Sequence, residues 1–143
     1  MNKQETMAEI LRCGKDPAYF CTGYAKISHP LRGLIPFDLY DFQKDSLKEF
    51  NKNRFSVILK ARQLGISTIT AAYVSWMMLF HKDKNVLVMA TKFGTAANLV
   101  KKVKAIVKMM AGQLKGKTVR PTEMASTLEN VFLSTKREEE EQG

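Results

Sequence analysis

The segment from residue 55 to residue 80 constrains the fold of this chain more than any other part of the sequence. Residues 55–60 (FSVILK) form a short apolar run with β-branched side chains, which is typical of a strand buried in a parallel sheet. A loop with one glycine, residues 61–66, follows this run. Ser67 is then placed to cap a helix over residues 68–80. The segment therefore predicts a strand, a short loop and a helix in that order.

The same order of elements repeats further along the chain. Residues 86–90 (VLVMA) form a second apolar run, and a helix is expected over residues 95–110 after a short loop. Consecutive strand–helix units imply parallel strands joined by right-handed crossovers. The sequence therefore predicts an α/β fold, with residues 128–133 as one further candidate strand. An unpaired strand edge in such a sheet would favour aggregation.

Three regions are expected from the change in pattern along the chain. Residues 1–36 read as a lead-in segment, with one or two helical turns over 5–12 and a connector rich in Pro and Gly over 28–36. Residues 37–135 hold the main domain. Residues 136–143 form an acidic tail that we expect to be solvated and disordered.

Charge points toward a polyanionic partner, although a basic surface that serves solubility explains it equally well. The net charge is +9, and the last eight residues carry two positive and four negative charges, so residues 1–135 carry +11. The densest basic stretch lies between Thr95 and Arg120, where the lysines form either a DNA-facing strip or the solvated face of an amphipathic helix.

The cysteines and the hydropathy pattern indicate the cellular location of the protein. Cys13 and Cys21 have no neighbouring metal ligands and are expected to be buried and reduced. The N-terminus lacks a secretory signal, and the longest apolar stretch, residues 69–80, is too short to span a bilayer. We therefore expect an intracellular protein without a membrane partner.

The loop over residues 60–68 (KARQLGIST) has the setting of a phosphate-binding loop, because it lies between an expected strand and the start of an expected helix. The common pattern is G-x-x-x-x-G-K-[ST]. Gly65 matches the second glycine, and Ser67 matches the hydroxyl that holds Mg²⁺. Lys60 replaces the first glycine, and Ile66 occupies the usual lysine position. The motif alone is therefore a failed match.

This loop nevertheless resembles the nucleotide-binding loop of phage terminase large subunits, which have an Arg–Gln pair before the glycine. Some members carry a deviant Walker A motif with its lysine five residues before the glycine, where this chain has Lys60. The resemblance implies an incomplete P-loop NTPase-like parallel sheet with flanking helices. It also implies a catalytic arginine finger at Arg62, for which a salt bridge or a DNA-backbone contact is an equal alternative. The implied nucleotide-binding residues of the loop are Lys60, Arg62, Gln63, Gly65, Ser67 and Thr68, with Ser67 also binding the metal.

Two flanking segments extend the resemblance. Residues 37–43 (FDLYDFQ) are similar to the adenine-recognition segment of terminases and helicases, which implies that Gln43 reads adenine and that Tyr40 or Phe42 packs on the base. The alternative is that these aromatic residues belong to the core, and for Phe42 we favour that alternative. The Ala-Thr-Lys sequence that ends at Lys92 resembles the family's motif after the second strand, which makes Lys92 a candidate DNA contact.

The resemblance, which covers residues 19–133, implies the ATP-binding portion of a viral DNA-packaging motor that uses ATP and Mg²⁺. Its implied partners are double-stranded DNA, a portal protein and a terminase small subunit, and its location is the host cytoplasm of a phage or prophage. No apolar run ends in the acidic residues of a Walker B motif, and the family's nuclease domain is absent. We therefore expect a fragment that hydrolyses ATP slowly or not at all. The alternatives are a non-catalytic basic DNA-binding module and a truncated protein that binds an intact motor.

Overall fold

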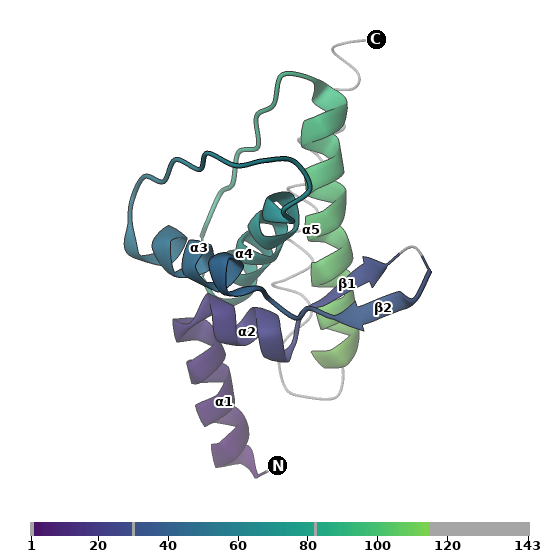
Figure 1. Ribbon diagram of the computed structural model, residues 1–143. Coiled ribbons are helices and arrows are strands. Elements are labelled where there is room, and N and C mark those ends of the chain that lie inside the picture. The colour runs from purple at the N-terminus through teal and green to yellow at the C-terminus, as the bar shows by residue number, and fades with distance from the viewer. Residues whose placement is uncertain (1, 30, 82, 115–143) are drawn as a thin grey trace.

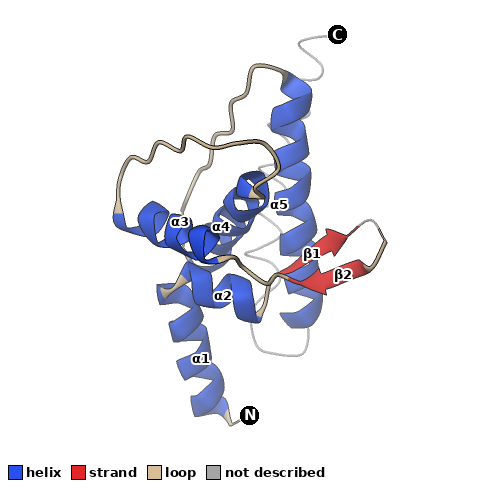
Figure 2. Ribbon diagram, in the orientation of Figure 1, coloured by secondary structure: helices blue, strands red, loops and turns tan. Residues whose placement is uncertain are grey.

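The computed structural model describes residues 2–29, 31–81 and 83–114 (Figure 1). Helices dominate these ranges, and the two strands pair with each other (Figure 2). The elements in chain order are α1 (Lys3–Lys15), α2 (Pro17–Gly23), β1 (Lys26–His29), β2 (Gly33–Pro36), α3 (Asp41–Lys52), α4 (Ile66–Phe80) and α5 (Phe93–Leu114).

The predicted parallel α/β sheet is wrong for the part of the chain that the structure describes. Residues 55–60 and 86–90, which we expected to be strands, form loops without strand pairing. Several of their apolar side chains lie in solvent, with exposed fractions of 99% for Val57, 101% for Leu59 and 83% for Met89. An apolar run favours a strand only when a neighbouring strand satisfies its backbone and covers its side chains. Neither segment has such a neighbour among the described residues.

The helix predictions are largely confirmed, although the helix limits differ. The one or two helical turns that we expected over residues 5–12 extend to thirteen residues in α1, and Asp16 then separates α1 from α2. Its carboxylate accepts hydrogen bonds from the backbone N–H groups of Ala18 and Tyr19, at 2.9 and 3.1 Å. Pro17 occupies the first helical position, where its missing N–H costs nothing. The sequence D-P therefore ends one helix and starts the next.

A carboxylate joins the first two helices. Glu9 of α1 accepts hydrogen bonds from the hydroxyl groups of Tyr19 and Tyr24, each at 2.6 Å. These two bonds lower the pKa of Glu9 below its ordinary value of 4.5, because they stabilise the charged carboxylate. Arg12 lies over the ring of Tyr19, with its guanidinium carbon 4.1 Å from the ring centre. The attachment of α1 to the following segment is therefore polar as well as apolar.

A hairpin replaces the irregular connector that we expected over residues 28–36. Strands β1 and β2 are antiparallel, with Lys26 opposite Pro36 and His29 opposite Gly33. Gly33 has a φ of +69°, a conformation that residues with a Cβ rarely adopt. The hairpin lies beside α5, and it carries the chain from the first pair of helices to α3 (Figure 1).

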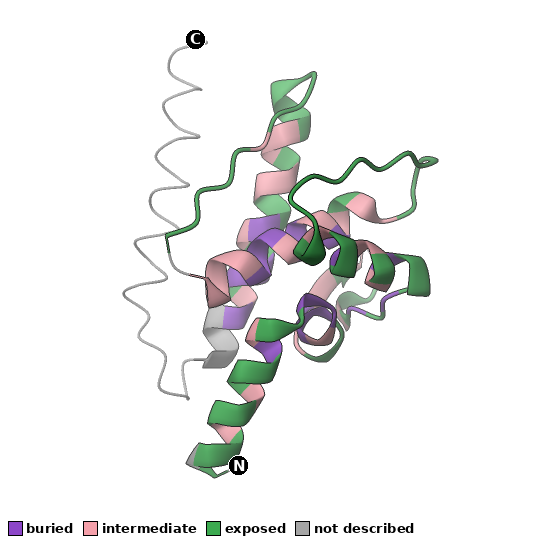
Figure 3. Ribbon diagram, turned by 90° about the vertical axis from the view of Figure 1, so that its left-hand side faces the viewer, coloured by how far each residue is buried: buried purple, intermediate pink, exposed green. Residues whose placement is uncertain are grey.

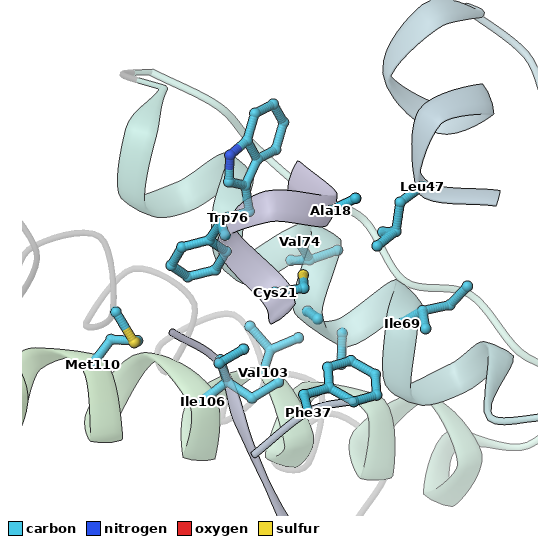
Figure 4. Close-up of a cluster of buried hydrophobic side chains, with 14 of the residues drawn as sticks. Ala18, Cys21, Phe37, Leu47, Ile69, Val74, Trp76, Val103, Ile106 and Met110 are labelled. Carbon is cyan, nitrogen blue, oxygen red and sulfur yellow. The ribbon is translucent and has the colours of Figure 1, made fainter. Parts of the chain in front are cut away.

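The core forms around α4, which packs against α2, α3 and α5. Buried residues gather where α4 and α5 meet, and the long loops on either side of α4 are exposed (Figure 3). Figure 4 shows the side chains of this cluster. Trp76 is 2% exposed, and its ring N–H donates a hydrogen bond of 2.7 Å to the buried carbonyl of Cys13. The expectation that Cys13 and Cys21 are buried is confirmed, and both are free thiols.

The last two helices each pack an apolar face against the core. Trp76 of α4 is buried, and Tyr73, Met77 and Phe80 are partly buried against the core. On α5, Val103, Ile106 and Met110 are buried, and Leu99 packs against them. Among the helices of the described residues, none has the length and hydropathy needed to cross a membrane. The candidate strand over 128–133 and the acidic tail lie outside the described residues.

Candidate functional site

Two residues of the loop that precedes α4 have a left-handed backbone conformation. Gln63 and Gly65 have positive φ angles of 61° and 71°, and Gly65 stands at the cap position. The Gly65 carbonyl accepts hydrogen bonds from the N–H groups of Thr68 and Ile69, at 3.1 and 3.0 Å. The helix therefore begins at Ile66, and our expectation that Ser67 caps it is wrong. Within the described residues, no side chain caps this end of the helix.

Most of the predicted loop residues are accessible to a ligand. Lys60, Arg62 and Gln63 are exposed, as is Ser67 in the first turn of α4, whereas Thr68 is half-buried. The Lys60 ammonium group donates a hydrogen bond of 3.3 Å to the neighbouring carbonyl of Ala61, a contact that a stronger acceptor can displace. Two cations thus precede the positive end of the α4 dipole, an arrangement that favours an anion.

Gln43 joins this loop to the start of α3. The residue is only 4% exposed, and its side-chain oxygen accepts a hydrogen bond of 3.1 Å from the backbone N–H of Tyr40. Its side-chain nitrogen donates a hydrogen bond of 3.1 Å to the carbonyl of Leu64, 21 positions further along the chain. The structure therefore brings together the two segments, 37–43 and 60–68, that the sequence singled out separately.

Gly65 lies close to the side-chain amide of Gln43. A Cβ atom placed on Gly65 would lie 2.7 Å from the side-chain nitrogen of Gln43, closer than such atoms approach in folded proteins. Glycine is therefore favoured here for two reasons, because a side chain would strain the positive φ and its Cβ would displace the neighbouring amide. The sequence pattern points to Gly65 through its place in the loop, but it does not reveal the contact with Gln43.

The aromatic residues of the 37–43 segment divide between the core and the surface. Phe37 is 4% exposed and belongs to the core. Tyr40 and Phe42 are 69% and 43% exposed, so our preference for Phe42 as a core residue is wrong. Their rings lie nearly parallel, at 6° with centroids 5.8 Å apart. Together they form an exposed aromatic surface, Tyr40/Phe42, next to the buried Gln43.

A magnesium ion would find one of its expected protein ligands in this loop, the exposed hydroxyl of Ser67. Among the described residues, no three His, Cys, Asp or Glu side chains gather into a metal-binding group. Mg²⁺ often binds through substrate phosphates and water with only one or two protein groups, so a single hydroxyl is compatible with a nucleotide-bound ion. Ser67 and the phosphates of a bound nucleotide would hold such an ion.

Among the described helices, α5 carries the most basic side chains, four lysines. Lys101, Lys102 and Lys108 are exposed, whereas the opposite face of the helix is buried in the core. Lys92, directly before α5, is exposed too. This distribution fits both interpretations of the lysines, the solvated face and the DNA-facing strip. Lys104 is half-buried, and the last basic positions of that stretch, Lys115, Lys117 and Arg120, lie outside the described residues.

No protein-family model matches this sequence.

Proposed function

We propose that this chain binds ATP with Mg²⁺ as the nucleotide-binding portion of a viral DNA-packaging terminase large subunit. The observation that carries the proposal is the hydrogen bond from Gln43 to Leu64, at 3.1 Å. This bond joins the exposed Tyr40/Phe42 surface to the basic loop before α4, and these are the two parts that a nucleotide needs. An aromatic surface takes the base, and a helix N-terminus with cations takes the phosphates.

Each loop residue has a distinct part in this proposal. The N-terminal turn of α4 and the loop backbone bind the phosphates, and Ser67 completes the coordination of Mg²⁺. Lys60 contributes a flexible point charge that reaches the outer phosphates from the start of the loop. Arg62 stabilises the charge that spreads over the γ-phosphoryl group during transfer. Gln63 and Thr68 lie next to Arg62 and Ser67 in the loop and are the remaining residues that we propose to contact the nucleotide.

Titration calorimetry with ATP and Mg²⁺ tests the proposal on the wild type and on Lys60→Ala. Loss of a charge-assisted hydrogen bond costs about 1.5–3 kcal/mol, which corresponds to a loss of affinity of about 10- to 150-fold. Lys48→Ala is the matched control, because Lys48 is also an exposed lysine but lies on α3. The proposal fails if the folded wild type binds no ATP, or if both variants bind ATP equally well.

Hydrolysis is expected to be slow or absent for this chain alone. Phosphoryl transfer depends on an acid that holds the metal ion and on a base that orients water, and the sequence offers no Walker B pattern for either. Phosphate release measured with and without DNA tests this point. Rapid turnover that Lys60→Ala abolishes would contradict the expectation and would assign the missing groups to residues that we have not identified.

A second candidate function, DNA binding by α5, is favoured by the exposed lysines at positions 101, 102 and 108. DNA affinity falls with salt, and each neutralised phosphate contributes about 0.9 to the slope of log K for DNA binding against log salt concentration. If these three residues each neutralise a phosphate, replacing all three by Gln reduces the magnitude of that slope by about 2.7. Measurement of DNA affinity at several salt concentrations gives this slope. An unchanged slope would mean that the lysines only solvate the helix. The portal protein and the terminase small subunit remain the protein partners that the resemblance proposes, and co-purification tests them.

A further inference from the structure

We infer that this nucleotide site holds the base by stacking alone and accepts purine and pyrimidine nucleoside triphosphates with similar affinity. The inference rests on the proposed function and extends it, because it replaces the adenine-reading role of Gln43 with a positioning role. The substrate class becomes nucleoside triphosphates in general, selected by their phosphates. The observation that carries it is the position of the Gln43 amide.

Selection of adenine by a glutamine requires the amide to present its donor and its acceptor to the edge of the base. Both polar atoms of Gln43 already have partners in the protein, the Tyr40 N–H and the Leu64 carbonyl, each at 3.1 Å. The residue is only 4% exposed, so a base cannot reach the amide N–H and the oxygen lone pair that have no protein partner. Rotating the amide toward a ligand would break both hydrogen bonds.

The Gln43 amide also lies close to Gly65. The space where its Cβ would lie is occupied by the Gln43 side-chain nitrogen, at 2.7 Å from the ideal Cβ position. The amide is therefore enclosed by the α3 cap on one side and by the loop on the other. Its contacts position the loop backbone from Leu64 to Gly65, directly before the first turn of α4. Gln43 thus acts on the ligand through the loop.

The exposed groups next to Gln43 have little ability to distinguish bases. Tyr40 and Phe42 present ring faces, and stacking on aromatic rings tolerates every base because each base has a π-face. The charged groups on the same turn, Asp41 and Lys44, lie 3.9 Å apart and pair with each other. The described residues of this turn therefore offer a stacking surface without an enclosed hydrogen-bonding pocket.

The test compares the dissociation constants of ATP, GTP, CTP and UTP, each with Mg²⁺, on the wild-type protein. The inference predicts that the four values agree within about fivefold, because stacking varies modestly among bases whereas a bidentate contact discriminates by up to about 150-fold. A preference for ATP of more than fivefold over the other three would overturn the inference and leave the proposed function intact. If no nucleotide binds, the proposed function itself fails.

Inorganic tripolyphosphate, which lacks a base, separates the two parts of the site. Tyr40→Ala changes an exposed side chain, so the variant is expected to fold, and it should weaken ATP binding but leave tripolyphosphate binding unchanged. Gln43→Ala should weaken ATP, GTP and tripolyphosphate by the same factor, because its effect passes through the loop. If Gln43→Ala, shown to be folded by circular dichroism, weakens ATP alone, the amide reads adenine and the inference is wrong.

Discussion

Substitution of Gly65 by alanine tests the contact on which the candidate site depends. Two costs combine at this position. A left-handed backbone conformation costs a residue with a Cβ about 1–2 kcal/mol. The new Cβ would also lie 2.7 Å from the Gln43 side-chain nitrogen and displace it from Leu64, and the loss of one hydrogen bond with a buried polar group left unsatisfied costs about 1–3 kcal/mol. Alanine restricts the unfolded chain and recovers about 0.4–1 kcal/mol. We therefore expect a destabilisation of about 1–5 kcal/mol.

The hairpin provides a matched control for the backbone term. Gly33 has nearly the same φ, +69° against +71°, but a Cβ placed there meets nothing within 4 Å. Gly33→Ala should therefore cost only about 0.5–1.5 kcal/mol, the conformational term less the restriction of the unfolded chain. The difference between the two variants isolates the contact with Gln43.

Urea denaturation followed by circular dichroism measures both variants. With a slope of about 1–2 kcal/mol per molar urea, a 2 kcal/mol difference in unfolding free energy separates the two midpoints by about 1–2 M. In a Gln43→Ala background, the additional cost of Gly65→Ala should disappear, because the clashing amide is gone. The reasoning is refuted if Gly65→Ala costs no more than Gly33→Ala, or if its full cost persists without Gln43.

Three further predictions concern the rest of the structure. Trp76→Phe removes the buried 2.7 Å hydrogen bond to the Cys13 carbonyl, so it should lower the unfolding free energy by about 1–3 kcal/mol in the same urea assay. An unchanged midpoint would mean that this hydrogen bond does not stabilise the fold. Because the folded pKa of Glu9 is lowered, its stabilising contribution is present above pH 4.5 and disappears as the pH falls through the lowered pKa. Glu9→Gln should therefore lose less stability than the wild type between pH 6 and pH 3, and parallel pH profiles would disprove the role. Leu59 is fully exposed, so Leu59→Lys should change the unfolding free energy by less than about 0.5 kcal/mol. The added charge should also reduce aggregation, measured as light scattering by concentrated samples. A large destabilisation would mean that this segment is packed.

Local chemistry in the sequence determined most of the helical structure. The D-P sequence at positions 16 and 17 specifies the break between α1 and α2, because a cap and a fixed φ act within a few residues. The apolar period of α5 identifies its buried face, with Val103 and Ile106 in the core. Gly65 was also singled out in the sequence as the second glycine of the phosphate-loop pattern, and the structure gives it a positive φ. All of these features depend on neighbours along the chain.

The tertiary structure alone decided the sheet and the site. Residues 55–60 and 86–90 have the composition of buried strands, but a strand requires a partner across space, and neither segment has one within the described residues. The contact of Gln43 also depends on tertiary structure. Its sequence neighbours favour a base contact, whereas its hydrogen-bond partner Leu64 lies 21 positions away. Short-range patterns describe how a segment can fold, whereas burial and long-range hydrogen bonds depend on which segments meet. The candidate site is therefore a product of tertiary packing, although its residues are visible in the sequence.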